Sequence, residues 1–213
     1  MALTAVKTSD KSWEFAGFGP GAVSLRDLDV VFDSSPTEPV GRLVGLGFAS
    51  LPANLTSLAG IPVFQWDKQP APLKPHENTC VSVDHVVIHT NPKLLVEELQ
   101  KDLGRFGFEL KRERTDVYPG VTQLFYRQGK SGTVMEVIVM PTVERTALWG
   151  LTLVALDLDQ AKRLLGDTGA SQPKKAVQPG RRILTVRPPA NTTSTNIAVM
   201  TPHVSPTKQH PKL

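Results

Sequence analysis

The sequence has very little cysteine. Cys80 is the only one among 213 residues, so an internal disulfide framework is excluded and a reducing compartment is favoured. No neighbouring residue is placed to act as a base for this thiol. We therefore interpret Cys80 as an inert side chain.

Long apolar runs are also missing. No stretch of 18 apolar residues occurs, and the first 15 residues lack the apolar core of a signal peptide. We therefore expect a cytoplasmic protein with no membrane partner. The ending Pro211–Leu213 distantly resembles the Ser-Lys-Leu peroxisomal address, so a peroxisomal location is the alternative.

Aromatic residues are scarce at 6%, and no basic block is interleaved with them. Base stacking has few candidates, so no nucleic-acid partner is expected. The net charge of +4 is unevenly distributed. Residues 1–80 hold six Lys or Arg against eight Asp or Glu, whereas residues 81–213 hold 18 against 12. This excess favours a small anionic ligand.

The first third of the chain is strand-like but irregular. Residues 1–75 contain two strand-like pieces, Gly21–Asp33 and Val40–Ala49, separated by the turn-rich segment Ser34–Pro39. The segment Asp67–Thr79 has three prolines and no apolar period, which indicates a linker or strap. Residues 1–75 are therefore set apart from the rest of the chain.

Residues 81–141 are predicted to form a βαβββ unit. Val81–His89 alternates and is β-branched, which is typical of a strand. Asn91 and Pro92 favour a helix start, and Gly104 is expected to end that helix. Three further strands are predicted at Gly107–Arg114, Gly120–Gln128 and Thr133–Pro141.

Residues 148–202 repeat this order more loosely. A strand is predicted at Leu148–Leu156, and a short helix at Asp157–Leu165 with Asp157 as its cap. Further strands are expected at Arg181–Pro189 and Thr195–Pro202, with Ala176–Val177 as a short remnant of the missing one. Residues 76–203 are thus expected to form one domain, and residues 204–213 a flexible tail.

Two tandem βαβββ units, the first opening with "DHVVI" and closing with "MEVIV", resemble the vicinal oxygen chelate superfamily. This superfamily includes glyoxalase I, bleomycin-resistance proteins and extradiol dioxygenases. The segment from Trp149 to Pro202 is similar to an uncharacterised glyoxalase-like branch of it. The resemblance implies an α+β fold in which tandem units form curved mixed sheets around a cavity. Residues 1–75 do not match, and are expected to add an N-terminal extension or a partial extra module.

The resemblance also implies a metal site. In the superfamily, each unit contributes its first-strand histidine and last-strand glutamate to a divalent metal. The first unit supplies His85 and Glu136, and such mixed ligation suits zinc, nickel, iron or manganese. The second unit places Gly150 and Ile197 at these positions, which cannot bind metal. Two protein ligands seldom hold a catalytic ion, so the cofactor stays undetermined and a metal-free cavity is preferred.

His85 and Glu136 also have metal-free interpretations. Strand alternation places His85 and His89 on one face and Asp84 on the other. A structural histidine bonded to a carbonyl is the alternative for His85. Glu136 lies in an apolar run, where it is costly unless it pairs with His85, Arg127 or a metal. If desolvated, it would be a general base able to take a proton α to a carbonyl.

Other side chains are candidates for substrate binding. Arg182, or Arg181 in the alternate register, follows a tight turn and is suited to holding a carboxylate or phosphate. Its alternative is a solvated surface role. Phe125 and Trp149 are candidate stacking platforms with core packing as the alternative, and His89 is a candidate contact with a solvated or capping role as its alternative.

Three functions are compatible with these patterns. The first is a glyoxalase-like enzyme of lyase, isomerase or oxygenase type, acting on a small anionic metabolite through His85 and Glu136. The second is a metal-free protein that binds or sequesters a small molecule, which the missing ligands favour. The third is a structural or assembly subunit with a closed pocket. A homodimer is one arrangement that would supply further ligands.

Overall fold

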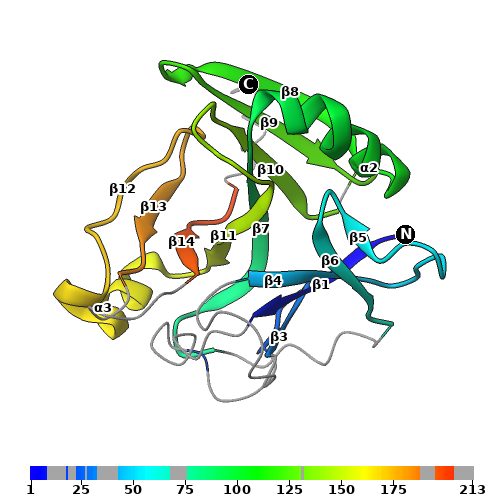
Figure 1. Cartoon of the computed structure of the whole chain (residues 1–213). Helices are drawn as coiled ribbons and strands as arrows, with labels where there is room; N and C mark the ends of the chain where they lie inside the picture. Colours follow the sequence, from blue (N-terminus) through cyan, green and yellow to red (C-terminus); the bar gives the residue numbers. More distant parts are fainter. Residues whose placement is uncertain are drawn as a thin grey trace, which may run out of the picture.

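The computed structural model describes residues 1–8, 18, 23–26, 28–32, 43–67, 76–130, 132–187 and 195–203. Over these residues the chain forms two mixed sheets with short helical segments (Figure 1). The predicted turn at Ser34–Pro39 and the tail 204–213 lie outside the described residues. None of the described helices is long and apolar enough to span a membrane.

The eight-stranded sheet has the order β12-β13-β14-β11-β7-β10-β9-β8. Its first four strands along the chain are β7 (Cys80–Thr90), β8 (Glu109–Tyr118), β9 (Val121–Arg127) and β10 (Val134–Val139). The other four are β11 (Ala147–Ala155), β12 (Lys174–Lys175), β13 (Arg182–Thr185) and β14 (Asn196–Met200).

Strand pairing confirms the two tandem units. In the first, β7 is parallel to β10, and β9 and β8 follow in antiparallel pairs. In the second, β11 is parallel to β14, and β13 and β12 follow in the same way. The antiparallel pair β7–β11 joins the two units. The expected α+β fold with curved mixed sheets is therefore observed.

The six-stranded sheet has the order β2-β3-β1-β4-β6-β5. Its strands are β1 (Leu3–Thr8), β2 (Val23–Ser24), β3 (Asp29–Phe32), β4 (Leu43–Phe48), β5 (Ser57–Leu58) and β6 (Ile61–Gln65). Each half again has a parallel pair, β1–β3 or β4–β6, extended by one antiparallel strand. An antiparallel β1–β4 pair joins the halves. This sheet repeats the pattern of the larger one with one strand fewer in each half.

The first helix differs from its prediction. It comprises α1 (Pro92–Leu94), a π-helical turn η2 (Leu95–Leu99) and α2 (Gln100–Arg105). The Asn91 side chain caps it, accepting a hydrogen bond from Leu94 N–H at 2.9 Å. Gly104 lies inside α2 instead of ending it. Gly107, with φ of +78°, adopts the left-handed conformation that glycine favours after a helix.

The second helix, α3 (Leu158–Gly169), begins as predicted. The Asp157 side chain accepts a hydrogen bond from Gln160 N–H at 2.8 Å, which satisfies one of the free donors at the helix start. Gly166, with φ of +69°, interrupts the helical conformation before the last residues of the segment.

One face of the large sheet belongs to a core shared with the small sheet. Fully buried residues such as Ile88 and Met135 join the same apolar cluster as Phe48 of β4, whose ring lies 4.7 Å from that of Phe106. The Gln128 side chain links the N-terminus to this core through hydrogen bonds to Met1, Leu3 and Phe106. The opposite face of the large sheet is left to line a cavity.

Candidate active site

A β-bulge in β7 shapes the candidate site. His85 pairs with Thr152 of β11 and Val83 pairs with Leu153, so Asp84 is the extra residue between them. A bulge disrupts strict alternation and re-aims side chains. Asp84 Oδ2 consequently lies 2.9 Å from His85 Nδ1, and both residues line one cavity. The expectation that Asp84 occupies the face opposite His85 is wrong at this position.

The predicted pair His85 and Glu136 is brought together. In the parallel pairing of β7 and β10, His85 is opposite Val134, one step along the same face from Glu136. His85 Nε2 lies 3.0 Å from Glu136 Oε2. Gln123 of β9, which the sequence did not single out, donates a hydrogen bond from Nε2 to Glu136 Oε1 at 2.9 Å. The orientation of the Glu136 carboxylate is therefore fixed from both sides.

Arg181, which does not line this cavity, extends the network through Asp84. Its side chain is fully buried, and Nη2 lies 2.7 Å from Asp84 Oδ1. Arg181 Nε donates to the carbonyl of Thr201 at 2.7 Å, and Nη1 donates to Gln178 Oε1. A continuous series of polar contacts thus runs from Arg181 through Asp84, His85 and Glu136 to Gln123.

This network moves the pKa values of its members. Burial by itself lowers the pKa of His85, but hydrogen bonds to Asp84 and Glu136 outweigh it and raise the pKa to about 9. Burial by itself raises the pKa of Asp84, but hydrogen bonds with His85 and Arg181 lower it to about 2. At neutral pH the site therefore holds a protonated imidazole beside an ionised Asp84.

The cavity above this network has a volume of about 650 Å³. The two ends of the large sheet supply its walls, because residues of β8 and β9 line it together with residues of β12 and β13. Six Lys or Arg side chains line the cavity: Lys111, Arg112, Arg114, Arg127, Lys174 and Lys175. Apolar lining comes from Phe125, Val134, Ile183 and Met200, among others. The cavity is thus basic at its walls and acidic only where Asp84 and Glu136 meet His85.

The predicted substrate-binding residues divide into two groups. Phe125 and Arg127 line the cavity with His85 and Glu136. Arg182 does not: its guanidinium forms two hydrogen bonds of 2.9 Å with Asp159 at the start of α3. The reason is the register of the turn before β13, which buries the preceding Arg181 and leaves Arg182 exposed.

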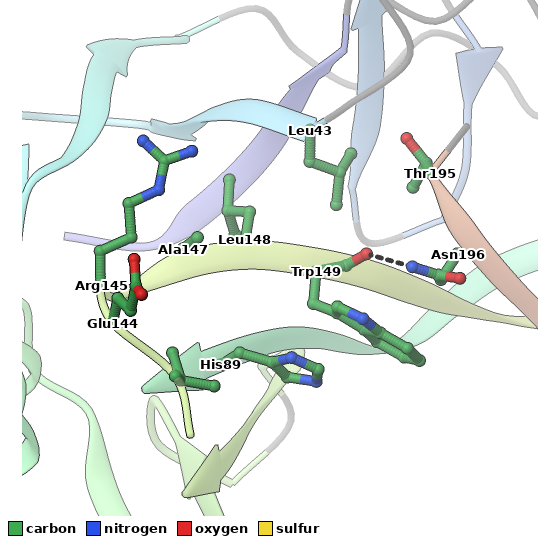
Figure 2. Close-up of a pocket in the computed structure, with 10 residues that line it drawn as sticks. Leu43, His89, Glu144, Arg145, Ala147, Leu148, Trp149, Thr195 and Asn196 are labelled. Atoms are coloured by element: carbon green, nitrogen blue, oxygen red, sulfur yellow. Dashed lines mark hydrogen bonds between the residues drawn. The ribbon is translucent and has the colours of Figure 1, made fainter. Parts of the chain in front are cut away.

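His89 and Trp149 lie in a different pocket, of about 450 Å³, lined also by Arg145 and Asn196. Their rings are stacked, with centroids 4.6 Å apart and planes at 18°. Figure 2 shows the two rings side by side, with Arg145 reaching away from them. Burial lowers the pKa of His89, although the charge of Glu136 opposes this. The structure therefore does not place these two residues in the cavity of His85.

The donor set does not fit a divalent metal. A Cβ atom at Gly150 would lie 2.3 Å from the carbonyl oxygen of Asn196, so no side chain fits there. Ile197 points into the core, and the β14 residue paired with Thr152 is Ala198. Within the described residues, no group of three His, Cys, Asp or Glu could hold a metal ion. Catalytic zinc sites usually have three protein ligands, whereas this cavity offers only His85 and Glu136 of the expected set.

Known proteins resemble this chain in their folds. No family model matches the sequence, and no curated protein matches it. A triple mutant of 4-hydroxymandelate synthase from Streptomyces coelicolor superimposes with a TM-score of 0.64 and 13% identity, covering 94% of this chain and 92% of that chain. Methylmalonyl-CoA epimerase from Mycobacterium tuberculosis gives a TM-score of 0.47 and 15% identity over 59% of this chain and 91% of that chain. At these identities the likeness shows the fold alone.

Proposed function

We propose that this chain, whose fold is that of the vicinal oxygen chelate superfamily, is an enzyme of isomerase or lyase type. It removes a proton from a carbon α to a carbonyl in a small anionic metabolite. The observation that carries this proposal is the contact of 3.0 Å between His85 and Glu136 in a cavity lined by six Lys or Arg side chains.

Glu136 is the general base in this mechanism. The substrate C–H bond breaks, its electron pair stays on the substrate as an enolate, and the proton goes to a Glu136 oxygen. Return of that proton from Glu136 to a neighbouring carbon gives an isomer. Expulsion of a β-substituent from the enolate gives the lyase outcome. Neither route requires an oxidant or a reductant.

His85 and its neighbours orient the Glu136 carboxylate and surround the anionic substrate. His85 and Gln123 each contact one oxygen of Glu136, so the carboxylate enters the reaction in a fixed orientation. Asp84 contacts the other ring nitrogen of His85, and Arg181 in turn pairs with Asp84. In the pairing of β9 with β10, Arg127 lies opposite Val134, one row from Glu136. Its guanidinium is suited to bind an anionic group of the substrate beside the reacting carbon.

Proton exchange in D₂O tests this function without knowledge of the final product. A panel of 2-oxo acids and acyl thioesters is incubated with the protein, and loss of the α-proton signal is followed by ¹H NMR. We expect the wild type to exchange at least one class, and Glu136→Gln to lose about 100-fold or more of that rate. Glu98→Gln, an exposed change on the first helix, is the matched control. Exchange at the wild-type rate in Glu136→Gln would contradict the proposal.

A metal-free binding or sequestering protein is the second candidate. It is favoured by one observation: the second unit places Thr152 opposite His85 and Ala198 next to Thr152, and neither side chain is a usual metal ligand. In that case a ligand recovered from the cavity would carry no deuterium after incubation in D₂O. A purely structural subunit is disfavoured, because a side-chain-filled pocket would not leave a cavity of about 650 Å³ at His85.

A further inference from the structure

We propose that the substrate carries two anionic groups, a phosphate held by Lys174 and Lys175 and a carboxylate held by Arg112 and Arg127. This inference rests on the proposed function, because it names the class of substrate for the same cavity. The compound would be a phosphorylated carbonyl acid whose reactive carbon lies at Glu136.

Some cations of this cavity lack a carboxylate partner in the described part of the chain. Two other cations that line the cavity have such partners, since Lys111 pairs with Glu109 and Arg114 pairs with Asp116. Arg182, which lies outside the cavity, pairs with Asp159. Lys174 and Lys175 have no ion pair within the described part of the chain, although they are adjacent and line the same cavity. Each lysine therefore brings a charge without a carboxylate partner to this wall, and an anionic group of a ligand would neutralise it.

On the opposite wall, Arg112 and Arg127 also have no carboxylate partner among the described residues. Arg112 lies 5.8 Å from the centroid of the Phe125 ring, a cation–π contact, and forms no ion pair with the described residues. Arg127 Nη1 donates to the backbone carbonyl of Lys130 at 3.3 Å. Both guanidinium groups therefore keep donors for a ligand. Their planar fork matches a carboxylate, whereas compact ammonium groups suit a phosphate.

The sheet order separates these two groups of cations. Strands β14, β11, β7 and β10 lie between β13 and β9, yet both ends of the sheet line one cavity because the sheet is curved (Figure 1). Glu136 is on β10, next to β9 with Arg127, whereas four strands separate β10 from β12 with the two lysines in the sheet order. A phosphate on Lys174 and Lys175 therefore occupies a different part of the cavity wall from Glu136. It supplies binding energy and orientation without taking part in the proton transfer.

The test uses inorganic diphosphate as the probe, measured by isothermal titration calorimetry at low salt. We expect the full chain to bind it, and the double variant Lys174→Gln/Lys175→Gln to bind it about tenfold or more weakly. The matched control is Lys93→Gln/Lys101→Gln, which removes two exposed charges on the first helix outside the cavity. The control is expected to bind within about twofold of the wild type.

Two results would overturn the inference. Equal weakening in both double variants would mean diffuse attraction to a basic protein, and no binding by the wild type would remove the phosphate site. Glu136→Gln separates this inference from the proposed function, because it is expected to bind diphosphate normally while losing proton exchange. Normal exchange in Glu136→Gln together with diphosphate bound at the lysines would reject the function and leave the anion site standing.

Discussion

His85 shows how single residues tune this site. The bulge at Asp84 gives the imidazole a carboxylate on Nδ1, and β10 gives it another on Nε2. The pKa of His85 rises from 6.5 to about 9, because these hydrogen bonds outweigh the effect of burial. A group whose pKa is raised by folding stabilises the folded state fully below its unfolded pKa. That contribution is lost as the pH rises through the folded value.

The raised pKa of His85 predicts how the stability of the protein depends on pH. The free energy of unfolding is expected to fall between about pH 6.5 and pH 9, by an amount on the order of a few kcal/mol. Urea denaturation across this range measures it. In His85→Gln this part of the pH dependence should disappear. An unchanged slope in the variant would mean that another group titrates there.

Arg181 and Arg182 are adjacent, but the first side chain is buried and the second is exposed. Replacing each in turn therefore compares a buried ion pair with an exposed one. Arg181→Met leaves the Asp84 charge without its buried partner, which should cost about 3–5 kcal/mol. Arg182→Met removes a solvent-exposed pair with Asp159, which water screens, and should cost far less than the loss of Arg181. Urea denaturation of both variants checks the difference. Equal costs would contradict the buried role of Arg181.

At the scale of elements, the sequence predicted the first unit well and the second only in outline. The β-branched alternation of Val81–His89 and the Asn91 cap correctly indicated β7 and the start of the helix. The bulge at Asp84 was not predictable, because it depends on the pairing of β7 with β11. For the same reason, the sequence could not decide whether Arg181 or Arg182 is buried. Local patterns do not contain the register between distant strands.

Strands β11 and β14 approach each other so closely at Gly150 that an added side chain should destabilise the protein. Gly150→Ala would put a Cβ atom 2.3 Å from the Asn196 backbone carbonyl, so one strand must move away from the other. We expect a loss of about 1–3 kcal/mol in the free energy of unfolding. Gly104→Ala in α2, where a Cβ meets nothing within 4 Å, is the control and should stabilise by up to about 1 kcal/mol. Denaturant unfolding of both variants tests this close approach.

For the whole molecule, the two sheets share one pairing scheme. The small sheet has the same parallel and antiparallel pairs as the large one, with one strand fewer in each half. The sequence suggested a partial module for residues 1–75, but short strands such as Val23–Ser24 and Ser57–Leu58 are too brief to show a period. Their arrangement becomes recognisable only through the partners they pair with.

The two sheets are expected to unfold together as one cooperative unit. Phe48 and Val6 of the small sheet are fully buried in the same cluster as Ile88 and Met135 of the large one. A chain that begins at residue 76 would expose this apolar face to water, which favours aggregation or loss of fixed packing. We therefore expect it to bind a hydrophobic dye and to lose its near-ultraviolet circular dichroism, whereas the full chain unfolds in one transition. A cooperative transition in the shortened chain would instead show that the large sheet folds alone.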